Sequence, residues 1–115
     1  MSVSSCKSPA EITTVSASAF QQEIAAPQAQ VLDVRDSSEF SEGHIDGAAN
    51  INVASPQFLN EAKKMLRKDK PVYVYCRGGR RSMEAAKELA NDGYNVVNLD
   101  GGIIGWEAEG KPVVK

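Results

Sequence analysis

The segment Cys76-Arg77-Gly78-Gly79-Arg80-Arg81-Ser82 combines residue types that could act chemically on a small anion. A cysteine thiolate is a strong nucleophile, and it forms at neutral pH where positive charge surrounds the sulfur. Three arginines supply such charge, and no ordinary change of pH removes it. Two adjacent glycines lack a Cβ, so successive backbone N–H groups can turn inward around an anion. The segment therefore predicts a nucleophilic cysteine, Cys76, in an anion-binding cradle.

Two predicted elements hold this segment in place. Residues 71–75 are rich in β-branched and aromatic types and predict a buried strand that ends just before the cysteine. Residues 82–92 predict a helix with one small apolar stripe, formed by Ala85, Ala86, Leu89 and Ala90. The positive end of that helix faces the loop, and arginines there oppose the helix dipole unless an anion is bound. Arg77, Arg80 and Arg81 are thus predicted to bind the substrate, together with Gly78 and Gly79.

Strand-like and helix-like segments alternate along the rest of the chain. Further strands are expected at residues 30–34, 49–53 and 95–99, with a short edge strand at 12–15. Further helices are expected between a Ser18 cap and Pro27, over residues 37–42 before Gly43, and from a Ser55 cap with Pro56 in the first turn. Gly101, Gly102 and Trp106 indicate a turn followed by a packing anchor. The pattern predicts an α/β fold with a mostly parallel sheet of four to five strands and helices on both faces.

Ligands of such sheets bind beyond the carboxyl ends of the strands. The cysteine lies at that end of the strongest predicted strand. We therefore expect the functional site at this edge of the sheet.

Length and charge restrict the possible partners. The chain has 115 residues, which suits one domain, and we expect a flexible N-terminal tail over residues 1–11 and the domain over 12–115. The net charge of -2 gives no overall attraction for nucleic acid or for an anionic membrane surface. No apolar run approaches the roughly 18 residues that a membrane span requires. We expect neither nucleic acid binding nor a membrane span.

The two cysteines and one histidine offer no metal-ligand spacing, so we expect neither a metal site nor a cofactor. Cys6 lies in a Ser-rich stretch, and a resolving role for it toward Cys76 is the less favoured interpretation. The expected location is cytoplasmic. The alternative is an exported, periplasmic or lipid-anchored protein that is attached through Cys6 and has lost its leader.

Three other polar residues could belong to the site. Asp33 and Arg35 end a predicted strand, and we favour a structural pair that anchors the loops over a place in the pocket floor. His44 could act as a general base. A thiolate that is stabilised by arginines needs no base, so His44 is expected to tether its own loop by hydrogen bonds.

The cysteine segment resembles the active-site loop of single-domain rhodaneses, the thiosulfate sulfurtransferases, through Cys76, Gly79, Arg81 and Ser82. An upstream signature is similar as well, in Leu32-Asp33-Val34-Arg35, Glu39-Phe40, Gly43-His44-Ile45-Asp46-Gly47-Ala48 and Asn50-Ile51. A C-terminal signature is similar in Leu99-Asp100-Gly101-Gly102, Trp106 and Gly110-Lys111-Pro112. The resemblance covers nearly the whole predicted domain.

This resemblance implies a rhodanese-like fold and a sulfurtransferase in which Cys76 attacks the sulfane sulfur of thiosulfate and carries it as a persulfide. The implied partners are a small anionic sulfur donor and a thiol or cyanide acceptor, with a thioredoxin-like protein as one candidate acceptor. Backbone N–H groups from Arg77 to Arg81 would form the cradle. Arg81 is expected to turn inward and brace the loop.

Two other classes of function, a cysteine phosphatase or arsenate reductase and a non-catalytic module, fit these residues less well. Cysteine phosphatases and the related arsenate reductases place one residue more between Cys and Arg than the four found here, and the residue before Cys76 is Tyr75 rather than histidine. A non-catalytic sulfur-carrier or interaction module is the third interpretation, and the retained cysteine speaks against it. A polysulfide or persulfide donor in place of thiosulfate stays open.

Overall fold

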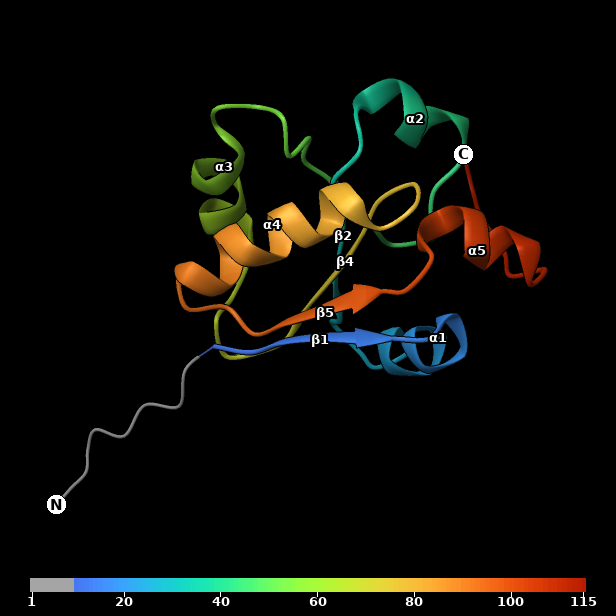
Figure 1. Ribbon diagram of the computed structural model, residues 1–115, viewed down its shortest axis with the longest axis horizontal. Coiled ribbons are helices and arrows are strands. Elements are labelled where there is room, and N and C mark those ends of the chain that lie inside the picture. Colours follow the sequence, from blue (N-terminus) through green and yellow to red (C-terminus); the bar gives the residue numbers. More distant parts are fainter. Residues whose placement is uncertain (1–9) are drawn as a thin grey trace, which may run out of the picture.

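Five parallel strands form the centre of the protein, in the order β1-β5-β4-β2-β3 (Figure 1). The structure is a computed structural model and describes residues 10–115. Its elements in chain order are β1 (Ile12–Val15), α1 (Ala17–Ile24), β2 (Gln30–Asp33), α2 (Ser37–Glu42), β3 (Ala49–Asn50), α3 (Phe58–Met65), β4 (Val72–Tyr75), α4 (Arg80–Asn91), β5 (Val96–Leu99) and α5 (Gly102–Ala108). The predicted α/β class and parallel sheet are confirmed.

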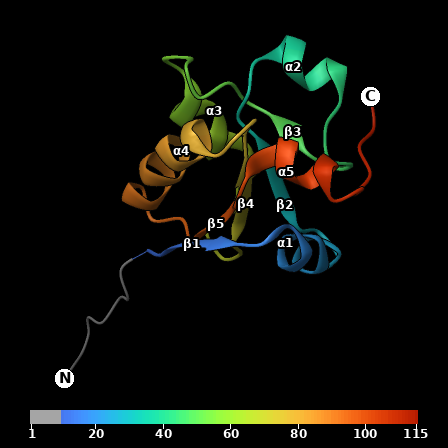
Figure 2. The same ribbon diagram turned by 45° about the vertical axis from the view of Figure 1, so that its right-hand side comes forward.

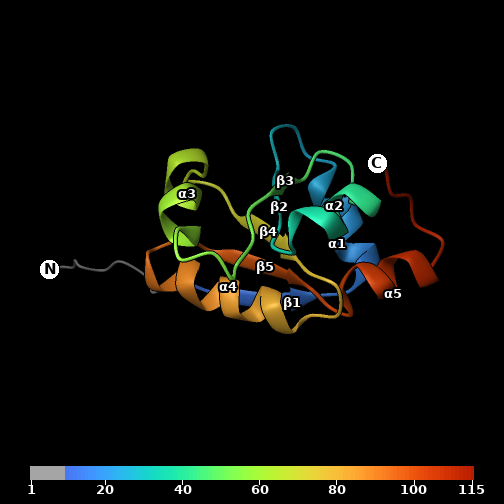
Figure 3. The ribbon, with the colours of Figure 1, turned by 90° about the horizontal axis from the view of Figure 1, so that it is seen from above.

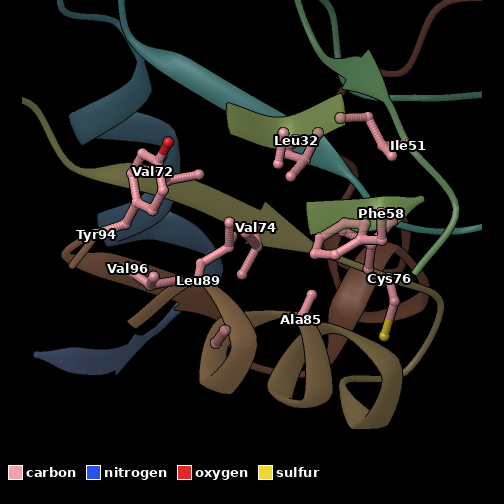
Figure 4. Close-up of a cluster of buried hydrophobic side chains, with 13 residues drawn as sticks. Leu32, Ile51, Phe58, Val72, Val74, Cys76, Ala85, Leu89, Tyr94 and Val96 are labelled. Carbon is pink, nitrogen blue, oxygen red and sulfur yellow. The ribbon is translucent and has the colours of Figure 1, made fainter. Parts of the chain in front are cut away.

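Helices cover both faces of the sheet, as expected (Figure 2). On one face α3 and α4 pack in a cluster that includes Leu32, Phe58, Val72, Val74, Leu89 and Cys76 (Figure 4). On the other face α1 and α5 pack in a second cluster that includes Phe20, Val31, Tyr73, Tyr75 and Trp106. Successive strand residues point to opposite faces, so a strand that is covered on both sides has no polar face. All four residues of β4 are accordingly buried.

Four predicted boundaries were wrong, and the first is the start of α4, which begins at Arg80 and not at Ser82. Helix α1 is capped by Ser16, whose Oγ accepts from the N–H of Ala19 at 3.1 Å, and not by Ser18. Helix α3 begins at Phe58 rather than at Pro56, because the N–H of Phe58 bonds to the carbonyl of Ser55 in a preceding turn. Strand β3 is two residues long and not five. Beyond it, the N–H groups of Ile51 and Val53 still donate to the carbonyls of Asp33 and Val34, but the regular pairing has ended.

The prediction of a turn at Gly101 and Gly102 missed a helix. Both glycines have a positive φ, of 78° and 62°, and the second of them begins α5. Trp106 is the expected packing anchor: it is buried, its Nε1–H donates to the carbonyl of Pro112 at 2.8 Å, and its ring meets Phe20 edge-on. The glycine-rich start hid the helix, because glycine is a poor helix former.

Helix α2 agrees with prediction in both bounds. Asp36 caps it, and Glu39 completes a reciprocal capping box with the Asp36 backbone.

The predicted tail over residues 1–11, Cys6 included, lies outside the described residues except for Ala10 and Glu11. The carbonyl of Glu11 accepts from the N–H of Val96, and its N–H donates to the side chain of Asn95. The longest helix within residues 10–115 is α4 with 12 residues, and no helix there is long and apolar enough to cross a membrane.

Candidate active site

Cys76 lies at the carboxyl end of β4, where the sequence places the site. Its side chain follows Val72 and Val74 on the same face of the strand, so the sulfur points toward α3 and α4 (Figure 4). Only 1% of the residue is exposed. The Cys76 side chain is therefore held in an apolar wall, and polar groups reach its sulfur from the following loop.

The loop supplies polar groups directly at the sulfur. The N–H of Gly79 donates to Cys76 Sγ at 3.0 Å, and the hydroxyl of Ser82 lies 3.4 Å from the same atom. Ser82 is fully buried, and its hydroxyl also lies 3.0 Å from the carbonyl of Gly79. Gly79 has a φ of 122°, a backbone conformation that other residues rarely adopt. Its lack of a side chain therefore allows the N–H to point inward at the sulfur.

Arg81 braces the loop against α2. Its guanidinium donates to both carboxylate oxygens of Glu39, at 2.8 and 2.9 Å, across 42 positions of sequence. These bonds raise the pKa of Arg81 and lower that of Glu39 to about 2. The positive charge of Arg81 is thus balanced within the protein, and nothing in the chain order indicates Glu39 as its partner.

This pair predicts an acid-sensitive contribution to stability. The carboxylate of Glu39 is favoured in the folded state, so its stabilisation is complete above about pH 4.5 and is lost as the pH falls toward 2. We expect Glu39→Gln to lower the free energy of unfolding by about 1 kcal/mol at pH 7, since the pair is only partly buried. Urea unfolding of both proteins should show this difference shrinking between pH 4.5 and 2. The exposed Glu84→Gln serves as the control, and an equal loss in that variant would contradict the assignment.

Arg77 and Arg80 are exposed, and neither forms an ion pair within residues 10–115. They differ in this from Arg81. Their charges are not balanced by a described carboxylate, and binding of the donor anion to them stays a prediction. The three arginines thus have unequal surroundings although the sequence presents them as one cluster.

Helix α5 docks onto the loop from the other side. The N–H groups of Ile103 and Ile104 donate to the carbonyls of Cys76 and Arg77, at 2.9 and 3.2 Å. Seen from above, the loop between β4 and α4 lies beside the start of α5 (Figure 3). A Cβ on Gly102 would stand 2.2 Å from the carbonyl oxygen of Arg77, so only glycine allows this approach. The adjacent glycines after β5 were the one sequence signal for this contact.

Asp33 and Arg35 form the structural pair that we favoured. The guanidinium of Arg35 lies 2.7 Å from Asp33 Oδ2 and donates to the carbonyl of Gly43 at 2.7 Å. Both residues are buried, at 0% and 5% exposure. Burial opposes the charge of Arg35, but the bonds and charge of Asp33 outweigh it and raise the pKa of Arg35. Arg35 also lines a cavity beside the loop, so the pair joins the site to the end of α2.

His44 holds its own turn in place. Its Nδ1 lies 2.9 Å from the carbonyl of Phe40, its ring stacks on the Phe40 ring, and its backbone pairs with Val114. These contacts match the tethering role that the sequence suggested. They connect the turn after α2 to the C-terminal segment.

A cavity of about 270 Å³ borders the loop between α2 and α5. Its lining consists of Arg35, Glu39, Glu42, Gly43, Arg77, Ile103, Ile104 and Glu107. Four of these residues are tied to the cysteine loop: Arg77 belongs to it, Glu39 pairs with Arg81, and Ile103 and Ile104 donate to the carbonyls of Cys76 and Arg77. The cavity is therefore a space beside the loop rather than one open over the sulfur.

Known proteins share this arrangement. Residues 16–109 match the family model for the Rhodanese-like domain. YtwF of Bacillus subtilis, which carries a provisional sulfurtransferase name, is 37% identical over 103 residues, covering 89% of this chain and 97% of that protein. GlpE of Shewanella oneidensis, a thiosulfate sulfurtransferase by name, is 39% identical over 83 residues, covering 70% and 78%.

A solved structure extends the likeness to three dimensions. The rhodanese-related protein from Thermoplasma volcanium has a TM-score of 0.78 at 37% identity, covering 89% of this chain and 97% of that one. The parallel sheet, the cysteine loop and these relatives together assign the chain to a family. This protein belongs to the rhodanese family and is an enzyme of the sulfurtransferase type.

Proposed function

We propose that the protein moves a sulfane sulfur from thiosulfate, or from a related persulfide or polysulfide donor, to a thiophilic acceptor through a persulfide on Cys76. The observation that carries this proposal is the bond from the Gly79 N–H to Cys76 Sγ at 3.0 Å. An N–H that donates to this sulfur beside a helix start is placed to donate to a persulfide formed on it as well. The catalytic unit is the domain over residues 12–115.

The reaction needs two displacements at sulfur. The Cys76 thiolate attacks the outer sulfur of thiosulfate, the sulfur–sulfur bond of the donor breaks, and sulfite leaves with the electron pair. The product is a Cys76 persulfide anion, which keeps the negative charge beside the loop. A thiolate or cyanide then attacks the outer sulfur of the persulfide, and the Cys76 thiolate leaves. No proton has to be held by a base, in agreement with the local contacts of His44.

The loop residues have distinct parts in this scheme. The backbone N–H groups between Arg77 and Arg81 hold the charge on sulfur, and the positive φ of Gly79 turns its N–H toward that atom. Arg77 and Arg80 attract and orient the anionic donor. Arg81 keeps the loop in place through Glu39 rather than through contact with the donor. Asp33 and Arg35 support the neighbouring loop without taking part in sulfur transfer.

Intact-mass analysis tests the proposal. We expect incubation with thiosulfate to add one sulfur atom to the protein and cyanide to remove it as thiocyanate. Cys76→Ala should show no addition, because the attacking thiol is gone, although Cys6, the second cysteine of the chain, is still present. Cys6→Ala, made in parallel, should load as the wild type does and so separates the two thiols.

The donor is varied in the same experiment. Loading by polysulfide but not by thiosulfate would assign the donor to the persulfide class and leave the cysteine chemistry intact. If neither donor adds sulfur to the folded wild-type protein, the sulfurtransferase proposal is wrong.

A further inference from the structure

Three hydrogen bonds form a closed ring at the cysteine loop. The N–H of Gly79 donates to Cys76 Sγ at 3.0 Å, the Cys76 thiol donates to Ser82 Oγ at 3.4 Å, and that hydroxyl donates to the Gly79 carbonyl at 3.0 Å. In the thiol form the ring is complete, because each of the three residues donates one hydrogen and accepts one. The ring joins the sulfur, the loop and the first turn of α4.

Loss of the thiol proton opens this ring at one place. A thiolate has no hydrogen to donate to Ser82, and the Ser82 hydroxyl carries a single hydrogen of its own. That hydrogen can point to the Gly79 carbonyl or turn to the sulfur. The carbonyl keeps a partner after such a turn, since the N–H of Met83 also donates to it, at 3.3 Å. The hydroxyl can therefore turn to the sulfur without leaving the carbonyl unpaired.

Burial makes this hydroxyl hard to replace. Ser82 and Cys76 are both buried, so bulk water has little access to the sulfur. Within residues 10–115, the hydrogen-bond partners of Sγ are the Ser82 hydroxyl and the Gly79 N–H alone. The N–H is fixed by the backbone, whereas the hydroxyl can rotate about its C–O bond. Ser82 is thus the partner of the sulfur whose hydrogen bond can change during a reaction.

We propose that Ser82 is a catalytic residue of the discharge step, in which its hydroxyl turns from the Gly79 carbonyl to Cys76 Sγ. The inference rests on the proposed sulfurtransferase function and adds a residue to it. In the persulfide anion the negative charge lies mainly on the outer sulfur. When cyanide attacks that sulfur, a carbon–sulfur bond forms, the sulfur–sulfur bond breaks, and its electron pair passes to Sγ as thiocyanate leaves. The hydroxyl then donates to the sulfur that has become a thiolate.

The same hydrogen bond does not assist loading. In that step the thiolate is the attacking group, and charge leaves Sγ as its bond to the donor sulfur forms. A hydroxyl that donates to the thiolate therefore stabilises the reactant more than the transition state, whereas only an interaction that is stronger in the transition state accelerates a step. We expect the Ser82 hydroxyl to speed discharge and to leave loading by the thiolate unchanged or slightly slower.

Intact-mass kinetics measure the two half-reactions separately. Loading is followed with thiosulfate at a pH where the rate of Cys76 alkylation by iodoacetamide has reached its plateau, so that the thiolate is fully formed in every variant. The loaded protein is then freed of donor and discharged with cyanide. In Ser82→Ala we expect discharge to slow about tenfold or more, the effect of one lost hydrogen bond to a charged group. Loading of the same variant should not slow.

Two further variants separate this role from support of the loop. Ser82→Thr keeps a hydroxyl and should restore discharge. Ser38→Ala makes the same change as Ser82→Ala at an exposed position of α2, and it should leave both rates unchanged. Urea unfolding shows whether each variant is folded. If the added methyl group of Ser82→Thr unfolds the protein, the ratio of discharge to loading rates in Ser82→Ala remains the test.

Several results would overturn the inference. A hydroxyl that only held the loop through the Gly79 carbonyl would slow loading and discharge alike when removed, so equal losses in Ser82→Ala contradict the catalytic role. Discharge as fast as in the wild type contradicts it as well. Failure of the wild type to load is a different result, because it contradicts the proposed function itself.

Discussion

Gly102→Ala is expected to lower the free energy of unfolding by about 3 kcal/mol and to slow sulfur loading of Cys76. The new Cβ would stand 2.2 Å from the Arg77 carbonyl oxygen and 2.8 Å from that of Cys76, and backbone atoms cannot turn away as a side chain can. The φ of 62° also costs a non-glycine residue roughly 1–2 kcal/mol. Separation of α5 from the loop would weaken two hydrogen bonds, each worth about 1 kcal/mol.

Neighbouring glycines provide controls for this variant. Gly101→Ala keeps the unfavourable φ of 78° but meets only an ordinary contact at 3.8 Å, so it should show the conformational cost alone. Gly105→Ala lies within α5 with its nearest contact at 3.9 Å, and it should be neutral or slightly stabilising. Urea unfolding and the rate of sulfur loading measure both effects. If Gly102→Ala is as stable as Gly101→Ala, the close approach of α5 does not hold the loop.

Asp33→Ala is expected to lower the free energy of unfolding by about 3–5 kcal/mol, because it leaves the buried guanidinium of Arg35 without its counter-charge. The Arg35 side chain would keep only its bond to the Gly43 carbonyl. The Arg35 side chain would then no longer be held in place beside the end of α2 and in the cavity wall. Sulfur transfer should fall as well, through this displacement rather than through a missing catalytic group.

An exposed pair gives the matched comparison. Asp69→Ala removes the partner of Arg67, whose side chain is 62% exposed, and should cost less than about 1 kcal/mol. Asp33→Ala/Arg35→Met should regain part of the stability of Asp33→Ala, since it removes the unpaired buried charge. The urea unfolding midpoints of the wild type and of these three variants measure the differences in stability. Equal losses in Asp33→Ala and Asp69→Ala would mean that the buried pair contributes no more than a surface one.

Much of the fold was predictable because its signals are local. The alternating strands and helices, the α2 bounds and the edge strand all follow from residues adjacent in the chain. The predicted ends were wrong for elements whose sequence signals were weak or misleading. Ser55 and Pro56 form a turn before α3, and the glycine-rich start of α5 concealed a helix that packing against the sheet stabilises.

By itself the sequence determined where Cys76 lies in the fold. A buried strand, two glycines and a helix follow one another in the chain, and backbone geometry then places Cys76 at the carboxyl end of the sheet with an inward-facing N–H beside it. These relations depend on residues that are adjacent in the chain, so they can be inferred without knowing which distant residues the fold brings near.

Only the tertiary structure decided how the loop is held and which charges remain free. Glu39 lies 42 positions from Arg81, and α5 reaches the loop from the far side of the sheet, so neither contact has a signal in the chain order. Packing of α2 balances Arg81 and leaves Arg77 and Arg80 exposed, and packing of α3 and α4 buries Cys76. Three arginines that look alike in sequence thereby acquire different roles, because the field at each depends on the carboxylates that folding brings near it.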